Sequence, residues 1–78
     1  MKVELYTSSW CPFCIRAKQI LDGRQVTYTE FVMDGKDAEL DEVKKKYGHS
    51  TVPIVVIDDE LIGGCDELQA YVAAGKLK

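Results

Sequence analysis

Apolar and polar side chains alternate along Val3–Thr7, near the start of the chain. This two-residue period places one set of side chains on each face of a strand, so it predicts a short β-strand. Residues 26–32 are rich in β-branched and aromatic side chains and predict a second strand. Ile54–Ile57 is wholly apolar, which is typical of a strand buried on both faces. An acidic turn then leads to residues 60–62, so the pattern predicts that the chain returns as a hairpin.

Three other stretches carry apolar residues at spacings of three and four, the period of an amphipathic helix. The first begins at Cys11 and is stopped by Asp22 and Gly23, with Gly23 as the expected left-handed residue. The second is Asp37–Tyr47, whose acids precede its lysines in the order that complements the helix dipole. The third spans residues 66–74. The predicted order is therefore β-α-β-α-β-β-α, an α/β fold in which a right-handed crossover joins the first two strands.

Size, composition and charge limit the possible functions. The chain has 78 residues, of which 46% are hydrophobic, enough for one domain over residues 1–78 with no linker. Its 3 cysteines are too few for a disulfide-stapled secreted scaffold. The sequence shows neither a signal-peptide pattern nor an apolar run of membrane-spanning length, so we expect a cytoplasmic protein that does not engage a membrane. The net charge of −3 argues against a nucleic-acid partner.

Candidate chemistry lies at Cys11 and Cys14, where the first predicted strand leads into the first helix. Cys11 falls near the helix N-cap, where free backbone N–H groups and the helix dipole stabilise a thiolate. Pro12 suits the first helical turn, because its φ is already helical and it has no N–H to leave unpaired. Cys14 follows one turn later on the same face. The pattern predicts a redox pair in which Cys11 is the nucleophile and Cys14 the resolving thiol.

A zinc site is the main alternative for such a pair, because paired cysteines at this spacing form half of many structural zinc sites. The other soft ligands are His49 and Cys65, which are far apart in the sequence and lack ligand spacing. A purely structural disulfide is also disfavoured, since so small a ring restricts little of the unfolded chain. We therefore expect no metal site.

The run Cys11-Pro12-Phe13-Cys14, followed by Thr51-Val52-Pro53 and by Gly63-Gly64-Cys65-Asp66, resembles the small dithiol glutaredoxins. The resemblance covers essentially the whole chain, and the three motifs occur in register with the predicted elements. It implies a thioredoxin-like fold with a four-stranded mixed sheet and three helices. It also implies a thiol–disulfide oxidoreductase that uses glutathione as co-substrate and holds no bound cofactor.

The first two motifs carry part of the implied substrate site. Pro53 matches a cis-proline beside the active site, where the backbone of Val52, preceded by Thr51, pairs with the cysteine of glutathione as a short added strand. The alternative is that Pro53 merely begins a strand. The resemblance also implies that Phe13 is exposed between the cysteines and covers the mixed disulfide.

The third motif supplies the rest of the implied site. Gly64 leads into the third helix, whose N-terminal N–H groups would bind the γ-glutamyl carboxylate of glutathione. The Asp66 carboxylate would accept from the γ-glutamyl ammonium group, although Asp66 could equally serve as a simple N-cap. Cys65 is either a small packing residue or a secondary redox thiol, and we favour packing.

Two positions depart from the family pattern. Glutaredoxins often carry a lysine three residues before the first cysteine, where this chain has Ser8. They also often place a basic or amide side chain on the second helix, where this chain has Leu40. Both changes remove positive charge from the expected glutathione groove, so the alternatives are that glutathione binds more weakly or that Arg16, Lys44 or another lysine substitutes.

The combined expectation is a monomeric, glutathione-dependent oxidoreductase that reduces protein disulfides and glutathione mixed disulfides through Cys11 and Cys14. One alternative is a redoxin reduced by a thioredoxin reductase-type enzyme, which the missing charges at Ser8 and Leu40 keep open. Another is an iron–sulfur carrier, in which Cys11 and glutathione from two protomers hold one cluster. Pro12 and the second thiol weigh against the carrier.

Overall fold

The computed structural model describes residues 2–76 of the chain. Within this range lie four strands and three helices, namely β1 (Val3–Thr7), α1 (Pro12–Gly23), β2 (Thr29–Val32), α2 (Asp37–Tyr47), β3 (Ile54–Ile57), β4 (Glu60–Gly63) and α3 (Cys65–Ala73). The strands form one sheet in the order β2-β1-β3-β4, with β1 parallel to β2 and antiparallel to β3, and β3 antiparallel to β4. This arrangement confirms the predicted element order and the four-stranded mixed sheet. Among the same residues, none of the helices combines the length and the apolar character needed to cross a membrane.

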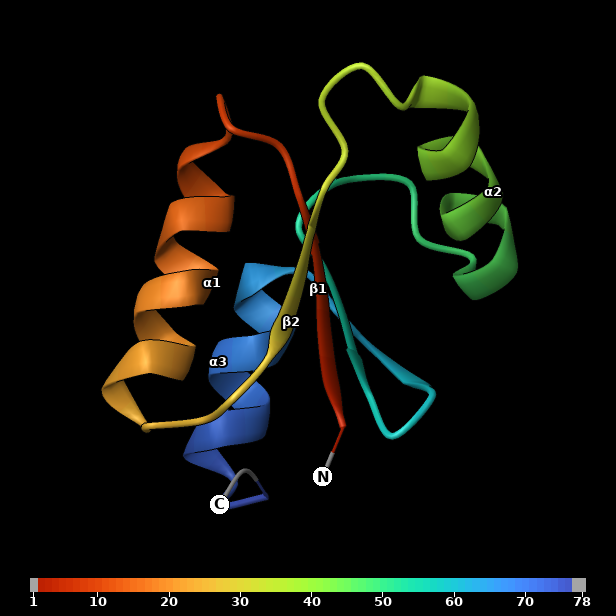
Figure 1. The fold of residues 1–78 in the computed structure, drawn as a ribbon. Coiled ribbons are helices and arrows are strands. Elements are labelled where there is room, and N and C mark those ends of the chain that lie inside the picture. The colour runs from red at the N-terminus through yellow and green to blue at the C-terminus, as the bar shows by residue number, and fades with distance from the viewer. Residues whose placement is uncertain (1, 77–78) are drawn as a thin grey trace.

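Helices cover both faces of the sheet (Figure 1). Helices α1 and α3 pack side by side on one face, over a core formed by Val3, Leu5, Ala17, Leu21, Val55, Ile57 and Leu68. Helix α2 lies on the other face, over a smaller cluster of Met33, Leu40, Ile54 and Val56. Strand β3 contributes to both clusters and is buried along its whole length, as its apolar run predicts. Burying each such side chain contributes roughly 1.5–3 kcal/mol.

The second strand is shorter than predicted, since β2 begins at Thr29 and not at residue 26. Its only neighbour is β1, whose paired residues start with Glu4 opposite Thr29. The chain before Thr29 turns back onto the end of α1 instead, where the Val26 N–H donates to the Leu21 carbonyl at 3.1 Å. The left-handed residue of this turn is Gln25, with φ of 57°. The prediction that Gly23 takes this conformation is wrong, because Gly23 is the last residue of α1.

Candidate active site

Cys11 occupies the N-cap of α1, in extended backbone with φ −90° and ψ 113°. Its carbonyl accepts from the N–H groups of Cys14 and Ile15 at 3.2 and 3.3 Å, which closes the first turn of the helix. Pro12 is the first helical residue, as predicted. A short loop from the end of β1 is held by the Cys11 N–H, which donates to the Ser8 carbonyl at 3.2 Å. The strand-to-helix junction therefore delivers Cys11 to the positive end of α1.

Cys14 lies one turn along α1 and is almost fully buried, with 1% of its surface exposed. Burial raises the pKa of its thiol to about 12, because a thiolate is poorly solvated there; a backbone hydrogen bond from the Ser8 region opposes this shift and the adjacent Cys11 thiol adds to it. At neutral pH Cys14 is therefore a protonated thiol, close to Cys11 and shielded from solvent. Cys11 is also buried, with 4% of its surface exposed, so the two thiols differ mainly in their position on α1, with Cys11 at the N-cap and Cys14 one turn further in.

The loop before β3 contacts the candidate nucleophile. The Cys11 thiol donates to the carbonyl of Val52, with Sγ and oxygen 3.8 Å apart. The Val52–Pro53 peptide bond is cis, as the motif predicts. Two segments about forty residues apart in sequence thus meet at the sulfur atom.

A cavity of about 170 Å³ opens beside this contact. Its lining includes every residue predicted to bind substrate: Phe13, Thr51, Val52, Pro53, Gly64, Cys65 and Asp66. Phe13 is 56% exposed, so its ring borders the opening. Two further lining residues, His49 and Glu67, were not predicted to belong to this site. We call this cavity the thiol groove, because its lining residue Val52 accepts from the Cys11 thiol; Cys11 itself is not part of the lining, and Cys65 is the one cysteine that is.

Glu67 caps the helix that bounds the thiol groove. Helix α3 starts at Cys65, one residue earlier than predicted, and its N-cap is Gly64. The Gly64 N–H donates to Glu67 Oε1 at 2.9 Å. Asp66 is consequently an exposed residue of the first helical turn, and the alternative that it serves as the N-cap is wrong. A glutamate three residues after a cap position is the sequence signal that could have identified Glu67.

Gly63 allows this close capping. Its φ of +127° is disfavoured for side-chain-bearing residues, and an added Cβ would lie 2.7 Å from Glu67 Cγ. Cys65, two residues later, is 5% exposed. Burial raises the pKa of the Cys65 thiol, although nearby Arg16 opposes the shift. Both properties agree with a packing role for Cys65.

The structure explains one of the missing positive charges. Leu40 is part of the core beneath α2, so it completes the small apolar cluster on that face. One turn later on α2, Lys44 lines a cavity together with Ser8, Trp10 and Leu40. Among the predicted substitutes, Lys44 therefore lies beside both altered positions, Ser8 and Leu40.

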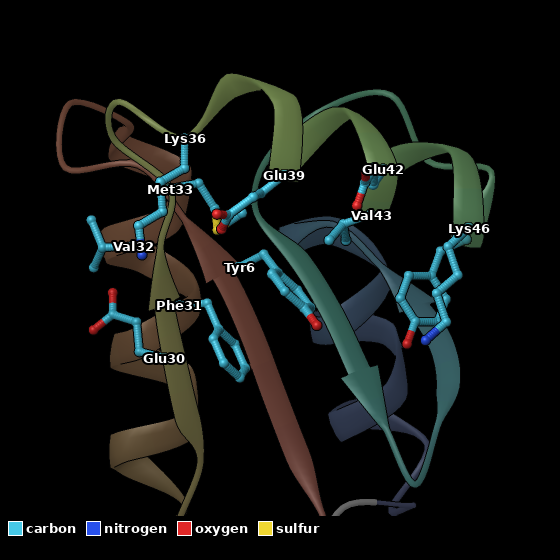
Figure 2. A pocket seen from close by; sticks show the side chains of 11 residues that line it. Tyr6, Glu30, Phe31, Val32, Met33, Lys36, Glu39, Glu42, Val43 and Lys46 are labelled. Atoms are coloured by element: carbon cyan, nitrogen blue, oxygen red, sulfur yellow. The ribbon is translucent and has the colours of Figure 1, made fainter.

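A larger cavity, of about 480 Å³, lies elsewhere (Figure 2). It separates α2 from β1 and β2, and we call it the α2 cavity. Its floor includes the rings of Tyr6 and Phe31, which stack with centroids 4.9 Å apart. Glu39, Glu42 and Lys46 of α2 border it, and its lining contains no cysteine. The α2 cavity has the volume for a ligand but holds no thiol.

Within residues 2–76, no three side chains of histidine, cysteine, aspartate or glutamate are grouped so that they could hold a metal ion. The three cysteines are all free thiols.

The sequence matches known redox proteins along most of its length. The family model described as Glutaredoxin matches residues 3–62. A glutaredoxin of Pseudomonas aeruginosa is 47% identical over 75 residues, which cover 96% of this chain and 89% of that protein. Glutaredoxin 3 of Escherichia coli strain K12 is 45% identical over 75 residues, which cover 96% of this chain and 90% of that protein.

Solved structures match the fold as well. Glutaredoxin 1 from Francisella tularensis, complexed with cacodylate, has a TM-score of 0.81 at 33% identity and covers 99% of this chain and 98% of its own. A buckwheat glutaredoxin–glutathione complex has a TM-score of 0.90 at 29% identity and covers 96% of this chain and 71% of its own. With two neighbouring cysteines at the start of α1 and these matches over nearly its full length, the chain belongs to the glutaredoxin family, redox proteins of the thioredoxin fold.

Proposed function

We propose that this protein is a glutathione-dependent thiol–disulfide oxidoreductase that reduces protein disulfides and glutathione mixed disulfides. The observation that carries the proposal is the meeting of Cys11 Sγ with the Val52 carbonyl at 3.8 Å, at the edge of the thiol groove. A nucleophile at a helix N-terminus, beside accessible backbone, suits a peptide-like substrate that carries a disulfide. The similar buckwheat glutaredoxin was solved as a glutathione complex, which supports this choice of thiol.

Glutathione would enter the thiol groove with its cysteine alongside Val52. Its γ-glutamyl carboxylate would lie at the N-terminus of α3, next to Gly64, where helix N–H groups favour an anion. Asp66 would accept from the γ-glutamyl ammonium group, and its exposed carboxylate on the groove wall leaves it free to do so. Phe13 would cover the sulfur atoms from the solvent side.

In the first chemical step, the Cys11 thiolate attacks one sulfur of the substrate disulfide. A mixed disulfide forms on Cys11, and the other substrate sulfur leaves as a thiolate that takes a proton from water. For a glutathione mixed disulfide, Cys11 takes up the glutathionyl group, and the thiolate of a second glutathione then attacks it. Oxidised glutathione leaves and the Cys11 thiolate is regenerated.

For a protein disulfide, Cys14 attacks the Cys11 sulfur and displaces the reduced protein. Because burial raises the pKa of Cys14 to about 12, this thiol must lose its proton as it attacks, and the departing substrate thiolate can accept it. The position of Cys14 one turn from Cys11 compensates for this high pKa, since an intramolecular thiol has a very high effective concentration. Two glutathione molecules then reduce the Cys11–Cys14 disulfide and leave as oxidised glutathione.

A coupled assay tests the proposal. The protein is offered a glutathionylated peptide with NADPH and either glutathione plus glutathione reductase, or thioredoxin reductase alone. We expect turnover only in the glutathione arm. Turnover in the thioredoxin reductase arm alone would support the reductase-fed redoxin instead. Visible absorbance of anaerobically purified protein would support the iron–sulfur carrier.

A further inference from the structure

His49 lies at the thiol groove although no catalytic role requires it. It follows α2, and its backbone N–H donates to the Lys44 carbonyl at 3.0 Å. Its Nε2 atom is 3.4 Å from Thr51 Oγ1. The same atom is 3.6 Å from the point that a Cβ on Gly64 would occupy. The imidazole therefore reaches from the end of α2 to the N-cap of α3.

The thiol groove is short of positive charge. Its lining includes two carboxylates, those of Asp66 and Glu67. Among the residues that line it there is no lysine or arginine, so His49 is the one lining side chain that can become cationic. A carboxylate that enters this groove consequently meets two like charges and one group able to offset them.

The excess of negative charge in the groove is greatest at the N-terminus of α3, because the Glu67 carboxylate lies there. Its carboxylate already accepts from the Gly64 N–H at 2.9 Å, so an internal anion occupies part of the helix terminus. Its Oε1 also lies 3.6 Å from the Gly64 Cβ position, the same separation as His49 Nε2. The imidazole and this carboxylate thus flank one point of the groove wall.

We propose that protonated His49 binds the γ-glutamyl carboxylate of glutathione at the N-terminus of α3, and so makes glutathione affinity rise as pH falls. This inference rests on the proposed function and adds to it a binding residue and a pH response. The imidazolium would direct its Nε2–H, which lies 3.4 Å from Thr51 Oγ1, to the substrate carboxylate in place of that hydroxyl. Histidine suits this response because its charge changes between about pH 5 and 8.

The other charges around His49 do not give the same response. Asp41, Lys44 and Lys45 of α2 line a separate cavity on the other side of the residue. Asp66 and Glu67 face it from α3, and the Cys65 thiol lies on the same wall. Carboxylates and lysines keep their charge across neutral pH, and the Cys11 thiol is the same in the natural protein and in His49→Gln, so a pH response that is lost in His49→Gln points to the imidazole.

The test measures binding of S-methylglutathione, whose blocked thiol cannot react, by NMR titration at about pH 6 and pH 8. For the natural protein we expect about two- to fivefold tighter binding at the lower pH, the scale of a partly exposed ion pair. His49→Gln should bind equally at both, with the affinity of the natural protein at the higher pH. His49→Arg should bind tightly at both. Lys45→Gln, the matched control, should keep the natural pH response.

A second probe identifies the carboxylate. S-methylcysteinylglycine lacks the γ-glutamyl group, so its binding should show no dependence on His49. The inference is overturned if S-methylglutathione binds the natural protein equally at both pH values, or if His49→Gln keeps the response. Failure of S-methylglutathione to bind at either pH would instead overturn the proposed function, and this inference with it.

Discussion

The thiol groove and the α2 cavity differ in the elements and side chains that line them, and this difference decides which of the two can carry thiol chemistry. The α2 cavity is larger, about 480 Å³ against about 170 Å³, and it has an aromatic floor. It is nonetheless lined by residues of β1, β2, α2 and the loop between β2 and α2, with no cysteine among them. The thiol groove brings together the start of α1, the loop before β3 and the start of α3, each of which presents backbone groups or a reactive side chain. The candidate active site therefore lies where the ends of three elements meet, and not in the cavity with the larger volume.

The largest expected effect comes from removing the nucleophile. Cys11→Ser should reduce both deglutathionylation and protein-disulfide reduction to the uncatalysed rate, because a serine hydroxyl stays protonated and is a poor nucleophile for sulfur. The matched control is Glu39→Gln, which alters the α2 cavity and should retain full activity in both assays. Loss of activity in Glu39→Gln as well would show that the α2 cavity takes part in catalysis, which contradicts the difference between the two cavities.

Cys14→Ser should separate the two activities. Deglutathionylation needs only Cys11 and should persist, whereas reduction of a protein disulfide should fall by about tenfold or more, because the nearby resolving thiol is lost. Both assays are run on the same variant at matched glutathione concentration. Equal loss in the two would mean that Cys14 shapes the Cys11 thiolate itself. Full retention of both would leave Cys65 as the resolving thiol.

Gly63→Ala tests the wall formed by α3. The new Cβ would collide with the Glu67 side chain and disturb the N-cap, so KM for a glutathione mixed disulfide should rise about three- to tenfold with little change in kcat, on top of a stability loss of about 1–3 kcal/mol. Gly75→Ala is the control, since Gly75 also has positive φ but its Cβ would meet nothing within 4 Å. Comparable KM changes in both variants would show that backbone strain, not the wall, is responsible.

Ser8→Lys should have a smaller effect, which is an increase in turnover at the thiol groove. A cation near the start of α1 should raise turnover with glutathione mixed disulfides about twofold to threefold at low salt, and the gain should shrink as salt screens exposed charges over about 10 Å at 0.1 M. Ser8→Gln controls for side-chain length. Unchanged turnover at low salt would show that Lys44 already supplies this charge.

The last expected effect is on alkaline stability and does not involve activity. Because the folded-state pKa of Cys14 is about 12, above the ordinary value of about 8.5, the unfolded chain loses this proton first as pH rises. The stability contributed by burying the neutral thiol is therefore complete below about pH 8.5 and is lost progressively towards pH 12. Denaturant unfolding of Cys14→Ala should show a shallower alkaline decline than the natural protein. A decline of identical slope would contradict the burial argument.

The sequence predicted most of the fold because its signals are local. Ile54–Ile57 is apolar throughout and is buried on both faces, and Asp37–Tyr47 has the charge order of a complete helix. The start of β2 was misjudged because β propensity extends to residue 26, whereas pairing requires a partner on β1. Only the tertiary structure determines where that partner begins.

The lining of the candidate site was predictable to a similar extent. The three motifs named the residues that the thiol groove brings together, since each motif lies at the end of an element. Glu67 and His49 were missed for different reasons. Glu67 carries a local capping signal that the boundary error at α3 concealed. His49 has no such signal, because its place beside Gly64 depends on how the loop after α2 meets the start of α3.

The most direct test of the central claim is a crystal structure of the Cys14→Ser variant after reaction with oxidised glutathione. This variant should trap glutathione as a mixed disulfide on Cys11. We predict that the tripeptide lies in the thiol groove, with its cysteine backbone against Val52 and its γ-glutamyl carboxylate at the start of α3. An adduct on Cys65, or a tripeptide lying in the α2 cavity, would contradict the account.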